Sequence, residues 1–305
     1  MEVKASAGAV VFHDAWPKTW PKIQVYITNS HHQNYYQADV AKGTVPPPGD
    51  WESPVPVYYP SVKPGVVFAF AVAPRLGGTD AKLLDLARQW LIGALTHLGA
   101  GAKTVRSYGC FEVDTTEADK QAIEKCNKVA RRAEETYTLQ LVTPAFLAGA
   151  SQKAEDCDLR ASTLRGQLRW WWRTMHAAHL SPCELRMLED ALWGSTKSSG
   201  AIAVRVEADK RLDPMMFNFR DPENRFKPEK RFKQQHRLGD TGHKETQGLF
   251  YASYGMDEKD KQRYVMPDGA TCKLTITTRG CEAPSRKMGA DDVMQIARNS
   301  LALLT

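Results

Sequence analysis

The stretch that decides the fold is LRASTLRGQLRWWWRTMH, residues 159–176. When its residues are placed at about 100° per residue, the apolar and the basic side chains fall on two different faces, which predicts an amphipathic helix. Its apolar face comprises Leu164, Leu168, Trp171 and Met175. Its second face contains no acid and comprises Arg165, Arg169, Arg173 and His176. Two interpretations stay open: a solvated basic face, or a helix that docks on a sheet and presents its charge to an anion such as RNA.

Composition places the chain among globular proteins and leaves a nucleic-acid partner possible. Its 305 residues are 42% hydrophobic and 25% charged, and this length allows two domains. The net charge is +6 and the isoelectric point about 8.9. This modest positive excess is compatible with binding nucleic acid without requiring it.

The six cysteines form no CxxC pair and show no finger-like spacing with histidine. We therefore expect no metal site and no cofactor, and scattered thiols favour the reducing cytoplasm. The first residues lack the pattern of a signal peptide. No run of about 18 apolar residues occurs, so no membrane span is expected.

The first part of the chain is predicted to be strand-rich. Strands are expected at 8–12, 22–27 and 66–73, and the proline-rich stretch 43–57 is predicted to be an irregular loop. A helix is predicted over 81–99, with Asp80 as its N-cap. The segment 99–113 is predicted to be a glycine-rich loop that enters a strand. Residues 114–136 are highly charged and indicate either a linker or a surface helix.

The second part restarts with a strand that enters a glycine turn, 137–149. After the tryptophan helix, the sequence predicts a helix at 183–194, a turn and strand at 195–207, strands at 248–255 and 271–280, and a helix at 291–304. The basic stretch 225–237 is interpreted as a mobile loop. The resulting order, β-α-(α)-β-β-α, is that of a ferredoxin-like fold without its last strand. The fold class is thus α+β.

The sequence GAGAKT, 99–104, differs from a phosphate-binding P-loop, because Ala102 stands where the pattern needs glycine and the loop follows a helix. Its backbone, with Lys103, Thr104 and Arg106, could still approach a phosphodiester. The alternative is a simple helix C-cap before an edge strand.

Histidines and aromatic residues suggest further hypotheses. His13–Asp14 and His31–His32 are candidates for acid–base chemistry, but no nucleophile or carboxylate cluster accompanies them, so we assign no catalytic residue. Tyr35 and Tyr36 could stack on bases, with packing against the proline loop favoured. Trp170 could stack on a partner, with packing against the helix at 183–194 favoured.

Two groups of motifs resemble RAMP proteins of the Cmr complex, the type III-B CRISPR effector. TPAFLAG (143–149), the helix motif from Ser162 to Arg173, and Trp193-Gly194-Ser195 resemble the first half of its subunit one. The helix motif is one residue longer than the family's pattern. VVFHDAWP (10–17), HHQNYY (31–36), PPPGDWESPVPV (46–57) and GAGAKTVRSYGCF (99–111) resemble the second half of subunit six. Ser107 stands there in place of a usual glycine.

The resemblance implies ferredoxin-like units at 1–115 and 137–305, joined by a charged linker at 116–136. It implies a non-catalytic subunit that binds guide RNA near its 3′ region, meets target RNA and other Cmr subunits, and caps the effector filament. The expected RNA-binding residues are Lys103, Thr104, Arg106, Arg160, Arg165, Arg169, Trp170, Arg173, His176, Ser195 and Lys197.

Two alternatives for function and two for the organisation of the chain stay open. The chain could be an endoribonuclease that uses His13, His31 or His176 on the guide precursor, or a fragment that docks on partner proteins. Each unit also lacks part of its expected fold, which suggests a piece of a longer fusion. A further hypothesis is a composite in which the first unit's last strand completes the second unit's sheet.

Overall fold

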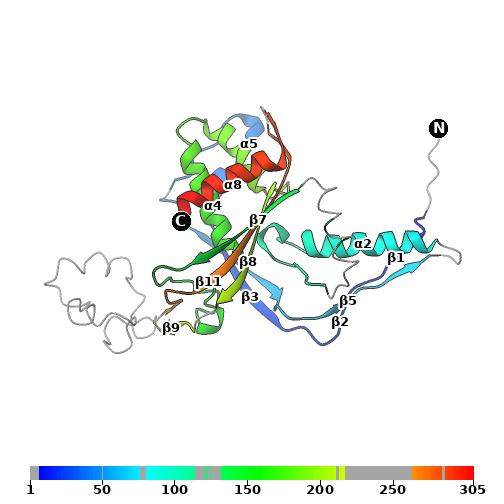
Figure 1. Cartoon of the computed structure of the whole chain (residues 1–305). Helices are drawn as coiled ribbons and strands as arrows, with labels where there is room; N and C mark the ends of the chain where they lie inside the picture. The colour runs from blue at the N-terminus through cyan, green and yellow to red at the C-terminus, as the bar shows by residue number, and fades with distance from the viewer. Residues whose placement is uncertain are drawn as a thin grey trace, which may run out of the picture.

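A three-stranded antiparallel sheet is the centre of the molecule (Figure 1). The computed structural model describes residues 7–49, 51–75, 80–113, 132–210, 213–216, 263–283 and 286–305, and positions 121 and 124. The sheet has the order β7-β11-β8, formed by Arg132–Gln140, Thr271–Arg279 and Ile202–Lys210. In its middle, Thr275 of β11 lies opposite Thr136 on one side and Arg205 on the other.

Helices cover one face of this sheet: α4 (Ala161–His176), α5 (Pro182–Trp193) and α8 (Ala290–Leu304) (Figure 1). The alternating residues Leu274 and Ile276 of β11 are buried in a common core with them, as strand periodicity requires. The core includes Leu168, Trp172, Leu192, Val293 and Met294 from the helices. The three long strands and three helices follow one another as β7-α4-α5-β8-β11-α8, which agrees with the predicted alternation of these elements.

The second part differs from prediction in three places. Strand β7 begins at Arg132, five residues before the predicted start at 137. Two further strands, β12 (Cys281–Ala283) and β13 (Arg286–Met288), form a hairpin that the sequence did not indicate. Short strands β9 (Met215–Met216) and β10 (Tyr264–Val265) also pair. The predicted basic loop 225–237 and strand 248–255 lie outside the described residues.

The first part forms separate two-stranded sheets. Its pairs are β1 (Val10–Phe12) with β6 (Val72–Pro74), β2 (Trp16–Pro17) with β5 (Phe68–Ala69), and β3 (Ile23–Ser30) with β4 (Val55–Val62). Its helices are α1 (Gln33–Gln37) and α2 (Ala81–His97), with 3-10 turns η1 (Val40–Lys42) and η2 (Thr104–Arg106). As predicted, the Asp80 side chain caps α2 by accepting from the Lys82 amide at 2.9 Å.

Three predictions for this part were wrong. The last residues of the stretch 43–57 begin strand β4, which tolerates prolines because it pairs on one side, with β3. The run 66–73 divides into β5 and the start of β6 and is not deeply buried; Val67 is 55% exposed. Residues 109–113 form no strand.

The composite sheet was also a wrong expectation. Among the described residues, the strands between 10 and 74 pair with one another, and none joins β7, β11 or β8. The two parts meet through other contacts: η2 packs against β8 and α4, and η1 packs against α5.

Candidate nucleic-acid interface

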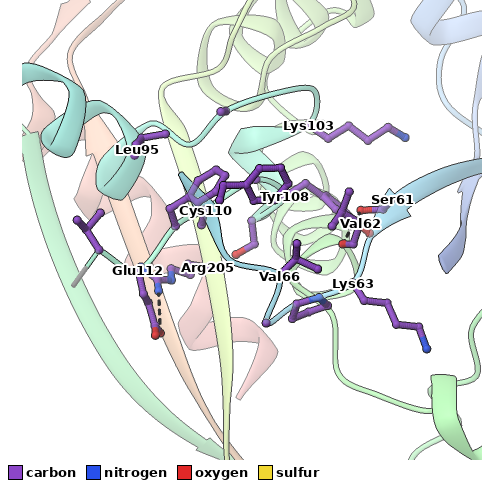
Figure 2. A pocket seen from close by; sticks show the side chains of 18 of the residues that line it. Ser61, Val62, Lys63, Val66, Leu95, Lys103, Tyr108, Cys110, Glu112 and Arg205 are labelled. Carbon is purple, nitrogen blue, oxygen red and sulfur yellow. Dashed lines mark hydrogen bonds and ion pairs between the residues drawn. The ribbon is translucent and has the colours of Figure 1, made fainter. Parts of the chain in front are cut away.

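An open groove of about 1660 Å³ lies where the two parts meet. Its walls come from the paired strands β3 and β4, from α2, from the segment 100–113, and from the residues around the start of α4 and the middle of β8. Figure 2 shows Lys63, Lys103, Tyr108 and Arg205 around it. The groove is basic at its lining: its cations are Lys18, Lys63, Arg88, Lys103, Arg106, Arg160 and Arg205, and its acids are Asp85, Glu112 and Asp158.

A tyrosine cluster stands in this groove. The Tyr26, Tyr59 and Tyr108 rings contact one another, with centroids 5.4–6.2 Å apart. The Tyr59 hydroxyl donates to the Tyr108 hydroxyl at 2.8 Å. The Lys103 ammonium lies 3.4 Å from the centre of the Tyr59 ring. Burial lowers the pKa of Lys103, and Tyr59 opposes that effect. Flat rings next to cations suit a chain of alternating bases and phosphates.

The glycine-rich loop holds Lys103 in position. The Ala100 amide donates to the Gly109 carbonyl at 2.8 Å, which closes the loop. Gly109 has a φ of 67°, and a Cβ there would lie 1.8 Å from the Ala100 oxygen, so glycine is required. The loop follows helix α2 and leads into η2. Thr104 begins η2 and does not line the groove, whereas Arg106 does.

The arginines of α4 point into the molecule instead of forming an open basic face. Arg165 is 4% exposed and Arg173 is 9% exposed. Helix α4 has no acidic residue, and its arginines pair with a carboxylate of α5. The fully buried Glu189 forms ion pairs with Arg169 and with Arg173, whose Nη1 lies 3.0 Å from Glu189 Oε1. Burial alone would raise the pKa of Glu189, but Arg169 and Arg173 outweigh it and lower the pKa. The two sequence interpretations of this face both missed this internal pairing.

Two tyrosines of the first part complete the Glu189 cluster. The hydroxyls of Tyr35 and Tyr36 each donate to Glu189 at 2.8 Å. Burial, with Glu189 nearby, raises the pKa of both, that of Tyr36 to about 12. Packing of these tyrosines against the proline loop was favoured from sequence, but their hydroxyls bind the α5 carboxylate. Tyr35 and Tyr36 are 154 and 153 positions away from Glu189 in the sequence, and no sequence pattern indicates a contact over that separation.

The three tryptophans divide differently from the prediction. Trp172 belongs to the core at 1% exposure, because the buried face runs through Leu164, Leu168 and Trp172. Trp171, predicted for that face, is half-buried. Trp170 is 37% exposed, and its ring meets that of Trp171 edge to face at 4.8 Å. The His176 ring stacks on Trp172, and its Nδ1 lies 2.8 Å from the Trp172 carbonyl oxygen.

The remaining predicted residues lie in two places. Arg160 lines the groove, and its Nη2 donates to the Ala148 carbonyl at 2.9 Å. Ser195 and Lys197 line a second hollow of about 1240 Å³, beside α5 and β12. The structure therefore gathers Lys103, Arg106 and Arg160 in the groove. It also adds cations that the sequence analysis did not single out: Lys18, Lys63, Arg88 and Arg205.

The histidine pairs do not form an evident acid–base site. His13 and Asp14 are exposed. His32 is buried, its Nδ1 lies 3.4 Å from Glu52, and burial lowers its pKa. Within the described ranges, no three histidine, cysteine or acidic side chains gather as metal ligands. In the same residues, no helix is long and apolar enough to cross a bilayer.

Comparisons with known proteins place these observations in context. Residues 138–266 match the family model of the RAMP superfamily. A stretch of 107 residues is 40% identical to the CRISPR system Cmr subunit Cmr6 of Pyrococcus furiosus, covering 33% of this chain and 30% of that protein. The chain thus spans under a third of that relative's length. The crystal structure of apo Cmr1 from Pyrococcus furiosus aligns over 56% of this chain and 43% of that chain, at 18% identity and a TM-score of 0.37. This score does not establish a shared fold.

Proposed function

We propose that this chain is a non-catalytic, RNA-binding RAMP subunit of a type III-B CRISPR (Cmr) ribonucleoprotein in the cytoplasm. It holds the 3′ region of the guide RNA, meets target RNA through it, and caps the effector filament beside other Cmr subunits. The RAMP match over 138–266 and the likeness to a Cmr6 subunit support the assignment to this complex. The strand order β7-β11-β8 supports a ferredoxin-like unit in the second part of the chain.

One observation carries the RNA-binding part of the proposal: the groove combines seven cations and three acids with a tyrosine cluster. Lys18, Lys63 and Lys103 would contact phosphates, while Tyr108, which meets the Tyr26 and Tyr59 rings edge to face, would contact bases. Phosphate contacts release counterions and carry no base information. Binding is therefore expected to weaken with salt and to show little sequence preference.

Exposed aromatic residues support the contact with partner proteins. Trp16, Trp20, Trp51 and Trp90 are between 62% and 93% exposed. On α2, Leu83, Leu86 and Trp90 follow one another at helical spacing and are all exposed. Large apolar side chains gathered at a surface mark interaction sites. This helix face is our candidate contact with a neighbouring subunit, and it is also what a docking fragment would use.

A binding titration tests the proposal. Fluorescent single-stranded RNA is added at two salt concentrations to the wild-type chain and to a Lys18/Lys63/Lys103→Ala variant. The variant is expected to bind at least about tenfold more weakly, with a salt slope smaller by about 2, since each lost phosphate contact removes about 0.7. The RNA should stay intact.

The matched control is Lys82/Lys273/Lys287→Ala, which removes the same charge from lysines outside the groove. It should bind like the wild type. Equal weakening in both variants would mean that net charge, and not the groove, attracts RNA. Cleavage of the RNA that His13→Ala, His31→Ala or His176→Ala abolishes would favour the endoribonuclease alternative.

A further inference from the structure

Behind the groove, arginines from the two parts of the chain meet. Arg106 follows the glycine-rich loop and lines the groove, while Arg165 and Arg169 lie on α4, against which η2 packs. Arg165 is almost wholly buried at 4% exposure. Burial lowers the pKa of Arg106 and of Arg165, and the neighbouring Arg169 lowers both further, as Arg106 does for Arg165.

These guanidinium groups lack sufficient counter-charge. Among the described residues, five arginines gather here and face two carboxylates, Glu189 and Asp190: they are Arg106, Arg165, Arg169, Arg173 and Arg186. Glu189 is shared by Arg169 and Arg173, and Asp190 pairs with Arg186. Among the described residues, Arg165 donates to a neutral acceptor, the Trp193 carbonyl. The Arg106 amide donates to the Lys103 carbonyl at 2.9 Å, but no hydrogen bond or ion pair of its side chain is found among the described residues.

Hydrogen-bond donors also remain unused. Arg165 Nε and Arg169 Nη2 are buried and have no partner within the described residues. A buried donor without an acceptor destabilises the folded state, and more so when it is charged. Burial, followed by Arg169 and Arg106, lowers the pKa of Arg165 to about 9, although arginine is ordinarily always charged. A bound anion would supply both the missing negative charge and the missing hydrogen-bond acceptors.

We propose that Arg106, Arg165 and Arg169 form a binding site for a phosphate-type oxyanion that enters from the groove beside Arg106. Planar guanidinium groups match the oxygens of such an anion and bind it with two bonds each. The anion has two possible sources, a phosphodiester of bound RNA or a free phosphate. The first source rests on the proposed function, whereas the second is independent of it.

The test uses thermal unfolding of the full chain in sodium phosphate and in sodium chloride of equal ionic strength. Wild-type Tm should rise by roughly 2–4 °C at a phosphate concentration about ten times the dissociation constant. Arg106→Gln, at a partly exposed position, should lose that rise. In chloride it should melt no lower than the wild type, because it removes a cation that has no carboxylate partner among the described residues.

Controls separate this site from general charge effects. Arg279→Gln changes an exposed arginine outside the groove and should keep the full rise. Arg165→Gln should lose it, and Arg106→Gln keeps the test decisive if Arg165→Gln does not fold. An equal rise in wild type and Arg106→Gln, or no rise in wild type, would overturn the proposal.

RNA identifies the source of the anion. If single-stranded RNA cancels the response to phosphate, the site takes an RNA phosphodiester. If phosphate still raises Tm in the presence of bound RNA, the site takes a free anion. The Lys18/Lys63/Lys103→Ala variant keeps the three arginines and should therefore keep the phosphate response. If phosphate raises Tm but neither the wild type nor any variant binds RNA, the anion site is supported and the proposed function fails.

Discussion

At the scale of single residues, Glu189 shows how a sequence pattern can mislead. The arginine spacing on α4 correctly predicts that these residues share one face of a helix. That face is covered, because one carboxylate on α5 accepts hydrogen bonds from two arginines and two tyrosines. Sequence periodicity identifies residues that share a face and gives no information about what lies opposite it. The three groove residues found from sequence, Lys103, Arg106 and Arg160, flank recognisable local motifs.

Replacing Glu189 should be strongly destabilising. Glu189→Gln leaves the partly buried Arg169 and the buried Arg173 without their paired carboxylate, and breaking such a pair typically costs about 3–5 kcal/mol. Urea denaturation measures the loss in the free energy of unfolding. Glu282→Gln, which removes the exposed partner of Lys287, should change it by less than about 1 kcal/mol. Equal stability of Glu189→Gln and wild type would contradict the described cluster.

His97, at the end of α2, should make stability depend on pH. Burial lowers its pKa below the ordinary 6.5, with Glu134 opposing and Arg132 and Arg205 adding to the effect. As the pH decreases through about 6.5, the unfolded chain therefore binds more protons than the folded chain, so the free energy of unfolding decreases as the pH is lowered. Between pH 7.5 and 5.5, His97→Gln should lose less unfolding free energy than wild type. Parallel curves for the two proteins would refute this.

At the scale of elements, helices were easier to predict than strands. Local signals delimit α2 and α5: Asp80 caps the first, while Ser181, Pro182 and Glu184 begin the second. Strand β4 contains Pro56 and Pro60 and was missed because its stability depends on pairing with β3, not on its own composition. The β12–β13 hairpin is short and likewise depends on its partner.

Removing the cap of α5 should cost a modest, measurable amount. The Ser181 hydroxyl accepts from the Glu184 amide, and Glu184 accepts from the Ser181 amide at 2.9 Å. Ser181→Ala should therefore lower the unfolding free energy by about 1 kcal/mol. Ser162→Ala, on α4 where Arg160 is the cap position, should have little effect. Chemical denaturation compares them, and a neutral Ser181→Ala would argue against the capping box.

At the scale of the whole molecule, the two parts are joined by contacts of very long sequence separation. Tyr35 and Tyr36 reach Glu189 across about half the chain, and η2 packs against β8 and α4. Neither contact leaves a signal in one sequence, since hydroxyl donors and carboxylates occur throughout the chain. Consequently the element order could be predicted, but the groove formed between the parts could not.

Weakening this joint should loosen α1 without unfolding the sheet. Tyr35→Phe/Tyr36→Phe removes two hydrogen bonds to a buried carboxylate, each worth about 1.5–3 kcal/mol. Hydrogen exchange at the amides of residues 33–37 should accelerate, while β11 stays protected. Tyr58→Phe, at a 60% exposed position, is the control. Unchanged exchange in α1 would show that these bonds do not hold the parts together.

The central claim is that RNA lies in the groove between the two parts. Photocrosslinking with 4-thiouridine-substituted single-stranded RNA, followed by mass spectrometry of the attached peptides, tests it most directly. Crosslinks should concentrate at Tyr26, Tyr59 and Tyr108 and in the segment 99–113, which line the groove. Crosslinks confined to other surfaces, such as the hollow beside Ser195 and Lys197, with the groove unlabelled, would contradict the account.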